Sequence, residues 1–83
     1  MIASAVRVRA FGRIREITGS EMSLEVTGDE RIQSLWERLC TDHPALRALR
    51  ESTRFYRNGV LAKPDEIVAP GDEVGLLPPV GGG

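Results

Sequence analysis

The chain has 83 residues, of which 41% are hydrophobic and 28% are charged, and its formal net charge is −1. This size and composition predict one small globular domain, and the near-neutral charge argues against a general nucleic-acid binder. No apolar run approaches the roughly 20 residues that a membrane helix needs, and Met1–Ala5 lead directly into a strand-like segment. We therefore expect neither a membrane anchor nor a secretory signal peptide.

The inventory of reactive side chains is small. Cys40 is the only cysteine and His43 the only histidine, so one chain can form neither a disulfide nor a zinc site from these ligand types. A single cysteine fits a reducing cytoplasmic location. The chain also has no phosphate-binding loop and no nucleophile elbow. We expect no metal, and we expect this protein to bind, to carry a group or to be modified.

Residues 5–11 alternate between two kinds of side chain, as a half-buried strand does. One face would carry Val6, Val8 and Ala10, and the other Arg7, Arg9 and Phe11. A second alternation over residues 22–27 predicts a neighbouring antiparallel strand. Between them, Gly12 and Gly19 bracket a segment in which Ile14 and Ile17 have the spacing of a helical turn.

The apolar period then changes from two residues to that of an amphipathic helix. The residues with this spacing are Ile32, Leu35, Trp36, Leu39 and Cys40. We expect Thr27 or Asp29 to cap the helix and Pro44 to end it at about Asp42. On the apolar face, Cys40 is expected to be a small buried hydrophobe and not a nucleophile.

The remaining segments predict a further helical turn at 44–50, a hairpin, a turn and a last strand. Asn58-Gly59 between two apolar runs favours a tight β-hairpin, and Pro70-Gly71 fits the centre of a type II turn. The strand Glu73–Leu77 would place Val74 and Leu76 on one face, with Gly75 and Leu77 on the other. The expected fold is α+β, with one main helix covering one face of a four- to five-stranded sheet.

The sheet face away from the helix would be either solvated or a docking surface. Its outward candidates are Arg7, Arg9, Phe11 and Leu77. The arginines, together with Arg13 and Arg15, favour a solvated face, with phosphate or an acidic protein patch as alternative ligands. Phe11 and Leu77 would form an apolar spot suited to a partner, although scattered surface hydrophobes explain them equally well.

The chain closes on Pro78-Pro79-Val80-Gly81-Gly82-Gly83. The prolines forbid helix, and glycines can thread a channel too narrow for any side chain. Five residues beyond Pro78 span roughly 16–18 Å when extended. We therefore divide the chain into a domain, 1–77, and a flexible tail, 78–83, whose free carboxylate would enter a partner's active site. The alternative is a frayed, inert end.

Several motifs together resemble the β-grasp sulfur carriers, above all the small subunit of molybdopterin synthase. They are the segment 11–19 after the first strand, Asn58-Gly59, the block from Gly71 to Val80, and the closing Gly82-Gly83. The resemblance covers most of the chain and implies a ubiquitin-like β-grasp fold. Gly81 adds a third glycine, and Leu76-Leu77 stand where relatives often carry a larger aromatic residue, which could retune partner docking.

The resemblance also implies a chemistry. An ATP-dependent adenylating enzyme (MoeB type) would convert the Gly83 carboxylate to an acyl-adenylate, and sulfur would replace AMP to leave a thiocarboxylate. The large subunit of molybdopterin synthase (MoaE type) would admit the tail and use the sulfur on cyclic pyranopterin monophosphate. Catalytic side chains would belong to that subunit, and ATP to the activating enzyme, so this chain would bind no cofactor itself. The residues expected to contact partners are Phe11, Leu77, Pro78, Pro79, Val80, Gly81 and Gly82.

Three other functions share the same tail. The sulfur could serve thiamin, cysteine or tRNA thiolation. Gly83 could instead be joined to lysines of target proteins, as in ubiquitin-like modifiers, although Lys63 as the only lysine makes chains built on this protein itself less favoured. A plain interaction module with an inert tail is the third. The Pro-Pro-Val sequence and the block before it favour the molybdopterin pathway over the thiamin pathway.

Overall fold

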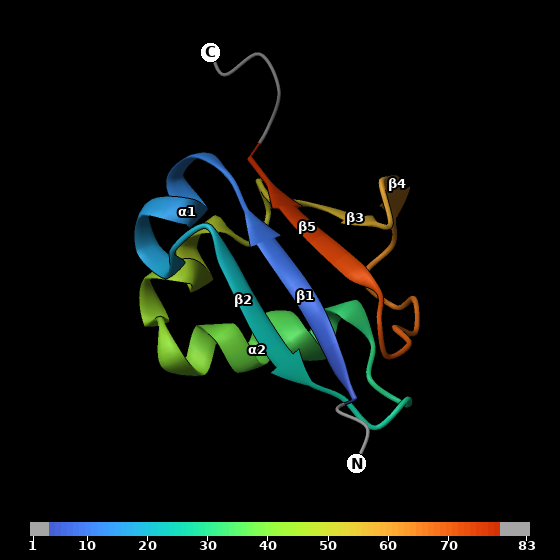
Figure 1. Cartoon of the computed structure of the whole chain (residues 1–83). Helices are drawn as coiled ribbons and strands as arrows, with labels where there is room; N and C mark the ends of the chain where they lie inside the picture. Colours follow the sequence, from blue (N-terminus) through green and yellow to red (C-terminus); the bar gives the residue numbers. More distant parts are fainter. Residues whose placement is uncertain (1–3, 79–83) are drawn as a thin grey trace.

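A computed structural model describes residues 4–78, and within them five strands form one mixed sheet (Figure 1). The strands are β1 (Ala5–Ala10), β2 (Glu21–Glu25), β3 (Arg54–Arg57), β4 (Val60–Ala62) and β5 (Glu73–Leu77). Their order in the sheet is β2-β1-β5-β3-β4. β1 and β5 run parallel, while the other neighbours are antiparallel. The predicted α+β class with up to five strands is confirmed.

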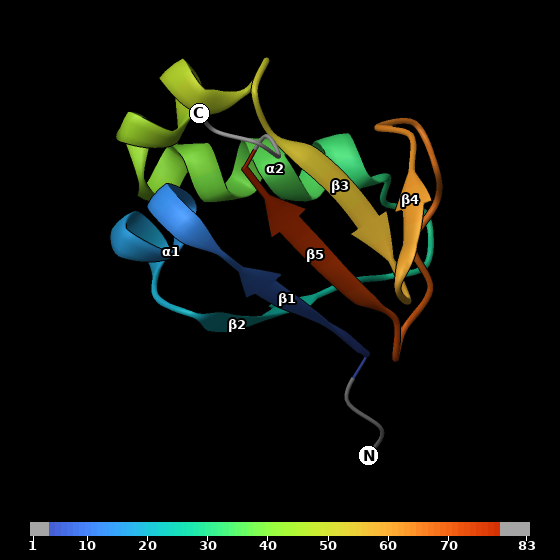
Figure 2. The same cartoon turned by 90° about the horizontal axis from the view of Figure 1, so that it is seen from above.

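One face of the sheet is covered by α2 (Ile32–Asp42), as Figure 2 shows from above. A short helix, α1 (Gly12–Thr18), connects β1 to β2, and a 3-10 helix, η1 (Pro44–Leu49), follows α2. Both lie where helical turns were predicted. Within residues 4–78, none of these helices is long and apolar enough to cross a membrane.

The core lies between α2 and the sheet, and its composition follows the predicted periodicities. The sheet contributes Val6, Val8, Ala10, Phe55, Val74 and Leu76, and α2 contributes Ile32, Leu35, Trp36, Leu39 and Cys40. Trp36 meets Phe55 edge-to-face, with ring centroids 5.8 Å apart and an interplanar angle of 63°. This geometry is the favoured one for aromatic pairs, and it joins the helix to β3.

The prediction that Thr27 or Asp29 caps α2 is wrong. No side chain caps this helix, which begins after Arg31. Thr27 instead donates its backbone N–H to the Glu30 carboxylate at 2.9 Å, which closes a small loop and ends the second strand at Glu25 instead of Thr27. The first helical N–H groups, of Ile32 and Gln33, donate to backbone carbonyls from the segment 64–66. Because those donors are already satisfied, a side-chain cap is unnecessary.

The two predicted turns have the expected backbone. Asn58 and Gly59 both have positive φ, 52° and 84°, as a two-residue hairpin turn of type I′ requires. In the second turn Gly71 has φ 92°, and the Asp72 N–H donates to the Ala69 carbonyl at 3.0 Å. That combination is a type II turn, and it reverses the chain just before β5.

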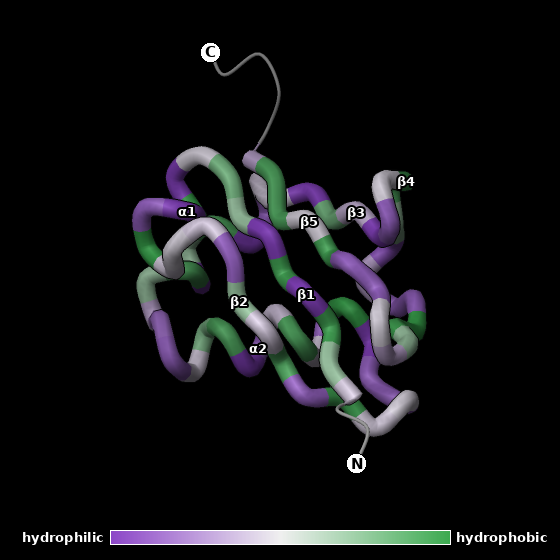
Figure 3. Tube along the Cα trace, viewed as in Figure 1, coloured by the Kyte–Doolittle hydropathy of each residue, from purple (hydrophilic) through white to green (hydrophobic). Residues whose placement is uncertain are grey.

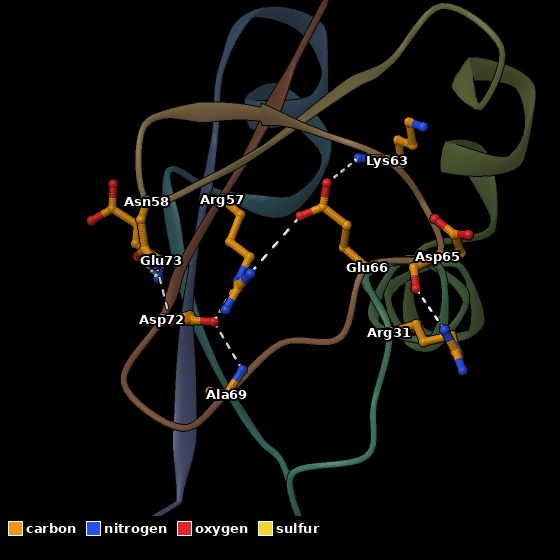
Figure 4. A network of polar contacts seen from close by, with 9 residues as sticks. All are labelled: Arg31, Arg57, Asn58, Lys63, Asp65, Glu66, Ala69, Asp72 and Glu73. Carbon is orange, nitrogen blue, oxygen red and sulfur yellow. Dashed lines mark hydrogen bonds and ion pairs between the residues drawn. The ribbon is translucent and has the colours of Figure 1, made fainter.

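Asp72 ties this turn to the β3–β4 hairpin (Figure 4). Its carboxylate accepts from Arg57 Nε at 2.8 Å, Asn58 Nδ2 at 3.0 Å and the Ala69 N–H at 2.8 Å. Asn58 Oδ1 in turn accepts from the Glu73 N–H at 2.9 Å. Burial alone would raise the pKa of Asp72, but these hydrogen bonds and the Arg57 charge outweigh it and lower the pKa.

We expect Asp72→Asn to destabilise the fold by about 1–2 kcal/mol at neutral pH, since a largely buried carboxylate loses charge-assisted hydrogen bonds. Because the folded pKa of Asp72 is lowered, this stabilisation is complete above the ordinary value near pH 4. It is lost as the pH falls from there through the folded pKa. Urea unfolding of both proteins measures the difference at neutral pH and below about pH 3.

The matched control is Asp65→Asn, which removes the same charge from an exposed side chain. Its effect should be within about 0.5 kcal/mol at either pH. Equal losses from the two substitutions, or a loss at Asp72 that persists unchanged at low pH, would contradict this role for the Asp72 carboxylate.

Candidate functional site at the root of the tail

The strand that leads to the tail, β5, lies in the middle of the sheet between β1 and β3. Near its end Leu76 is opposite Ala10 of β1, and Leu77 is opposite Arg54 of β3. The Phe11 N–H also donates to the Leu76 carbonyl at 3.1 Å. The position and direction in which the chain leaves the domain are thus set by neighbours on both sides.

Pro78, the first residue after β5, is half-buried and lies against Gly12 at the start of α1. A Cβ atom added to Gly12 would come within 2.7 Å of Pro78 Cγ, closer than side chains tolerate. Gly12 also has φ 57°, a left-handed conformation that L side chains rarely adopt. Gly12 therefore provides both the turn into α1 and the space in which Pro78 is seated.

Phe11 and Leu77 lie on the sheet face that the helices leave uncovered. The Arg9 guanidinium lies 5.5 Å from the centre of the Phe11 ring, a cation–π contact, and Phe11 is 37% exposed. Leu77 folds back over Gly75, where an added Cβ would lie 3.2 Å from Leu77 Cδ1. In Figure 3 the hydrophobic end of β5 and the end of β1 lie side by side. They form an apolar spot at the root of the tail.

Further along the same face the side chains are charged and paired. Arg7 lies 3.4 Å from Glu21 and 3.7 Å from Glu73, and Arg9 lies 3.7 Å from Glu73. The strand register explains this, because Glu73 is opposite Arg7, and Glu21 is opposite Arg9. These pairs are exposed and stabilise little, but they balance the charge of the two arginines. The interpretation of Arg7 and Arg9 as a solvated strand face is therefore supported over phosphate binding.

The described residues hold neither a cluster of metal ligands nor an exposed cysteine. Within residues 4–78 no three potential ligands among His, Cys, Asp and Glu come together to hold a metal ion. Cys40 is buried, at 1% exposure, and burial raises the pKa of its thiol, so it is a poor nucleophile as predicted.

Three of the predicted site residues, Phe11, Leu77 and Pro78, are brought together at the root of the tail. The others, Pro79, Val80, Gly81, Gly82 and Gly83, lie outside the described residues. Sequence reasoning missed the supporting roles of Gly12 and Gly75. Both glycines could have been noticed in the sequence, since each directly precedes or interrupts a segment with a regular pattern. Which residue each glycine contacts depends on the sheet register, which the sequence alone does not give.

Comparison with known proteins places the chain among sulfur carriers and ubiquitin-like modifiers. The profile of the ThiS family matches residues 8–83. Small archaeal modifier protein 1 of Haloferax volcanii is 33% identical, over 90% of this chain and 97% of that protein. The human molybdopterin synthase sulfur carrier subunit is 32% identical, over 94% of this chain and 93% of that protein.

Solved structures agree with the fold. The crystal structure of the Haloferax volcanii modifier matches with a TM-score of 0.80 and 31% identity, over 95% of this chain and 99% of that one. Subunit 1 of the molybdopterin-converting factor of Helicobacter pylori, solved in complex with subunit 2, matches with a TM-score of 0.68. It is 24% identical, over 95% of this chain and 99% of that one. The predicted ubiquitin-like β-grasp fold is confirmed.

We expect Gly12→Ala to shift Pro78 and the end of β5, because the added methyl group meets the proline ring. Gly19→Ala is the matched control: it has φ 92° but nothing within 4 Å of the added atom. Both variants should lose about 1–2 kcal/mol of folding free energy, because alanine is strained at a positive φ. Only Gly12→Ala should also change the amide chemical shifts of Leu76 and Leu77. Equal shifts in both variants would contradict the seat for Pro78.

Proposed function

Because this chain belongs to the ThiS family of ubiquitin-like β-grasp sulfur carriers and modifiers, we propose that it carries sulfur as a thiocarboxylate at Gly83. The observation that best supports this is the root of the tail. The chain leaves a central strand held on both sides, beside the exposed Phe11 and the half-buried Leu77. A partner that recognises this surface would receive the tail in one direction.

The chemistry follows from the properties of a chain end. An α-carboxylate has a pKa near about 3.5, so at neutral pH it is ionised and a poor acyl electrophile. In the proposed cycle the activating enzyme uses ATP to form an acyl-adenylate at Gly83 and releases pyrophosphate. A persulfide sulfur then attacks the carbonyl carbon, and AMP leaves with the bonding electrons. Reductive cleavage of the sulfur–sulfur bond by a donor thiol frees the thiocarboxylate.

We propose the large subunit of molybdopterin synthase as the acceptor partner, in the cytoplasm. Two observations support it: the human relative is a molybdopterin synthase sulfur carrier subunit, and the block Gly71–Val80 has the pattern expected of that subunit. In this proposal the tail enters the active site of the large subunit. Two sulfur transfers to cyclic pyranopterin monophosphate then produce the dithiolene.

A second function, covalent attachment of Gly83 to lysines of other proteins, is favoured by one observation. The Haloferax relative, a modifier protein, is about as similar to this chain as the human sulfur carrier is. Both functions begin with the same acyl-adenylate. They differ in the attacking group, which is a persulfide sulfur in one and a lysine amine in the other.

Intact mass spectrometry of the chain, incubated with a family adenylating enzyme, ATP and a persulfide donor, tests the proposal. We expect the mass gain of one oxygen replaced by sulfur, located on the last residue by fragmentation. Addition of molybdopterin synthase large subunit and its pterin substrate should return the mass to that of the carboxylate.

Deletion of Gly83 should abolish the gain, and Cys40→Ser is the control that should preserve it. The proposal is wrong if the sulfur is found on Cys40, or if the deletion variant is thiolated normally. Isopeptide adducts on proteins of a cell extract, without sulfur release to the pterin, would favour the modifier function.

We expect Leu77→Glu to weaken binding to the adenylating enzyme by about 2 kcal/mol or more, the scale of an interface anchor, while the fold stays intact. Val60→Glu is the matched control, since Val60 is 68% exposed on the edge strand β4 and away from the tail. Calorimetric titration gives the affinities, and circular dichroism checks the fold. An affinity unchanged by Leu77→Glu would exclude the apolar spot as the docking surface.

A further inference from the structure

A hollow of about 420 Å³ opens at the end of the β3–β4 hairpin away from its turn. The last residues that the two strands pair there are Phe55 and Ala62. The chain arrives at this end from η1 and leaves it through Lys63 and Pro64. Most residues around the hollow are either apolar or cationic, and Thr53 and Glu66 complete its lining. The apolar ones are Phe55, Leu61, Ala62 and Pro64, and the cationic ones are Arg50, Arg54 and Lys63.

The three cations lack acidic partners within the part of the chain that the structure describes. No carboxylate among residues 4–78 lies within ion-pair distance of Arg50, Arg54 or Lys63. Glu66 is the one acidic side chain that lines the hollow. Its carboxylate accepts from the Lys63 backbone N–H at 3.0 Å and lies 3.9 Å from Arg57 Nη1 (Figure 4).

Two of the cations are positioned by the fold, Arg50 by an aromatic ring and Arg54 by the strand that carries it. The Arg50 guanidinium lies 4.8 Å from the centre of the Phe55 ring, a cation–π contact that positions it at the hollow. Arg54 is in β3, opposite Leu77 of β5, so it lies beside the root of the tail. A protein that takes up the tail would therefore come close to these charges.

We propose that this hollow binds an extended acidic segment of the protein that receives the tail. Carboxylates of such a segment would meet Arg50, Arg54 and Lys63, while aliphatic side chains between them would contact Pro64 and Leu61, which is 58% exposed. The identity of the partner rests on the proposed function. Recognition of an acidic peptide by the hollow does not, because it involves no activation of Gly83.

Charge distribution favours a peptide over a nucleic acid. A phosphate backbone is bound by a continuous basic track, whereas the hollow brings together three cations among apolar side chains, in a chain with net charge −1. On the neighbouring sheet face Glu73 is near Arg7 and Arg9, which balances the positive charge there. The apolar lining also suits side chains better than ribose and phosphate.

The test is a titration of the full ¹⁵N-labelled chain in which binding is monitored through the amide chemical shifts. The probe is a capped peptide of alternating glutamate and leucine, and its matched control replaces each glutamate with glutamine. We expect the acidic peptide to shift the amides of Phe55, Ala62 and Lys63, with binding that weakens as salt is added. The glutamine peptide should bind about tenfold more weakly or not at all.

The double variant Arg54→Glu, Lys63→Glu should lower the affinity for the acidic peptide by about tenfold or more. Arg15→Glu, an exposed change on α1 away from the hollow, should leave the affinity within about twofold. The spectrum of each variant reports whether it is folded. Equal affinity for the two peptides, shifts outside the hollow, or tighter binding of a single-stranded oligonucleotide would overturn the proposal.

Discussion

The parallel pairing of β1 with β5 is the interaction on which the rest of this structure depends. It joins the first and last strands of the chain at the centre of the sheet, so that the C-terminal ends of both strands lie at the same end of the sheet. At that end the Phe11 N–H meets the Leu76 carbonyl, and Gly12 makes room for Pro78. An antiparallel pairing would send the last strand to the opposite end, away from Phe11. The direction in which the tail leaves is therefore a property of the topology.

The two faces of the sheet differ in how far their side chains are buried and in the kind of side chain they carry. The inner face is covered by α2, and its residues on β1, β3 and β5 are almost completely buried. The outer face carries exposed ion pairs on β1, β2 and β5, and the apolar Phe11 and Leu77 lie near the tail.

Sequence periodicity predicted most of the fold because its signals are local. The alternation in β1, the apolar stripe of α2, and the turns at Asn58-Gly59 and Pro70-Gly71 each follow from neighbours within a few residues. The start of α2 was predicted wrongly because its N–H groups are satisfied by carbonyls some 30 residues later in the chain, which no local pattern reveals. The seat for Pro78 and the basic hollow were missed for the same reason, since each joins segments that only the sheet register brings together.

The two ends of β5 also differ in the contacts that their residues make. At its start, Asp72 and Glu73 are tied to Arg57 and Asn58 by hydrogen bonds that do not involve the outer apolar spot. At its end, Leu77 lies over a glycine and projects from a face that nothing in residues 4–78 covers. Substitutions at the start should therefore act on the free energy of unfolding, and those at the end on partner affinity. Since β5 is central and paired with β1 and β3 along its length, a change at its half-buried end need not loosen the network that holds its start.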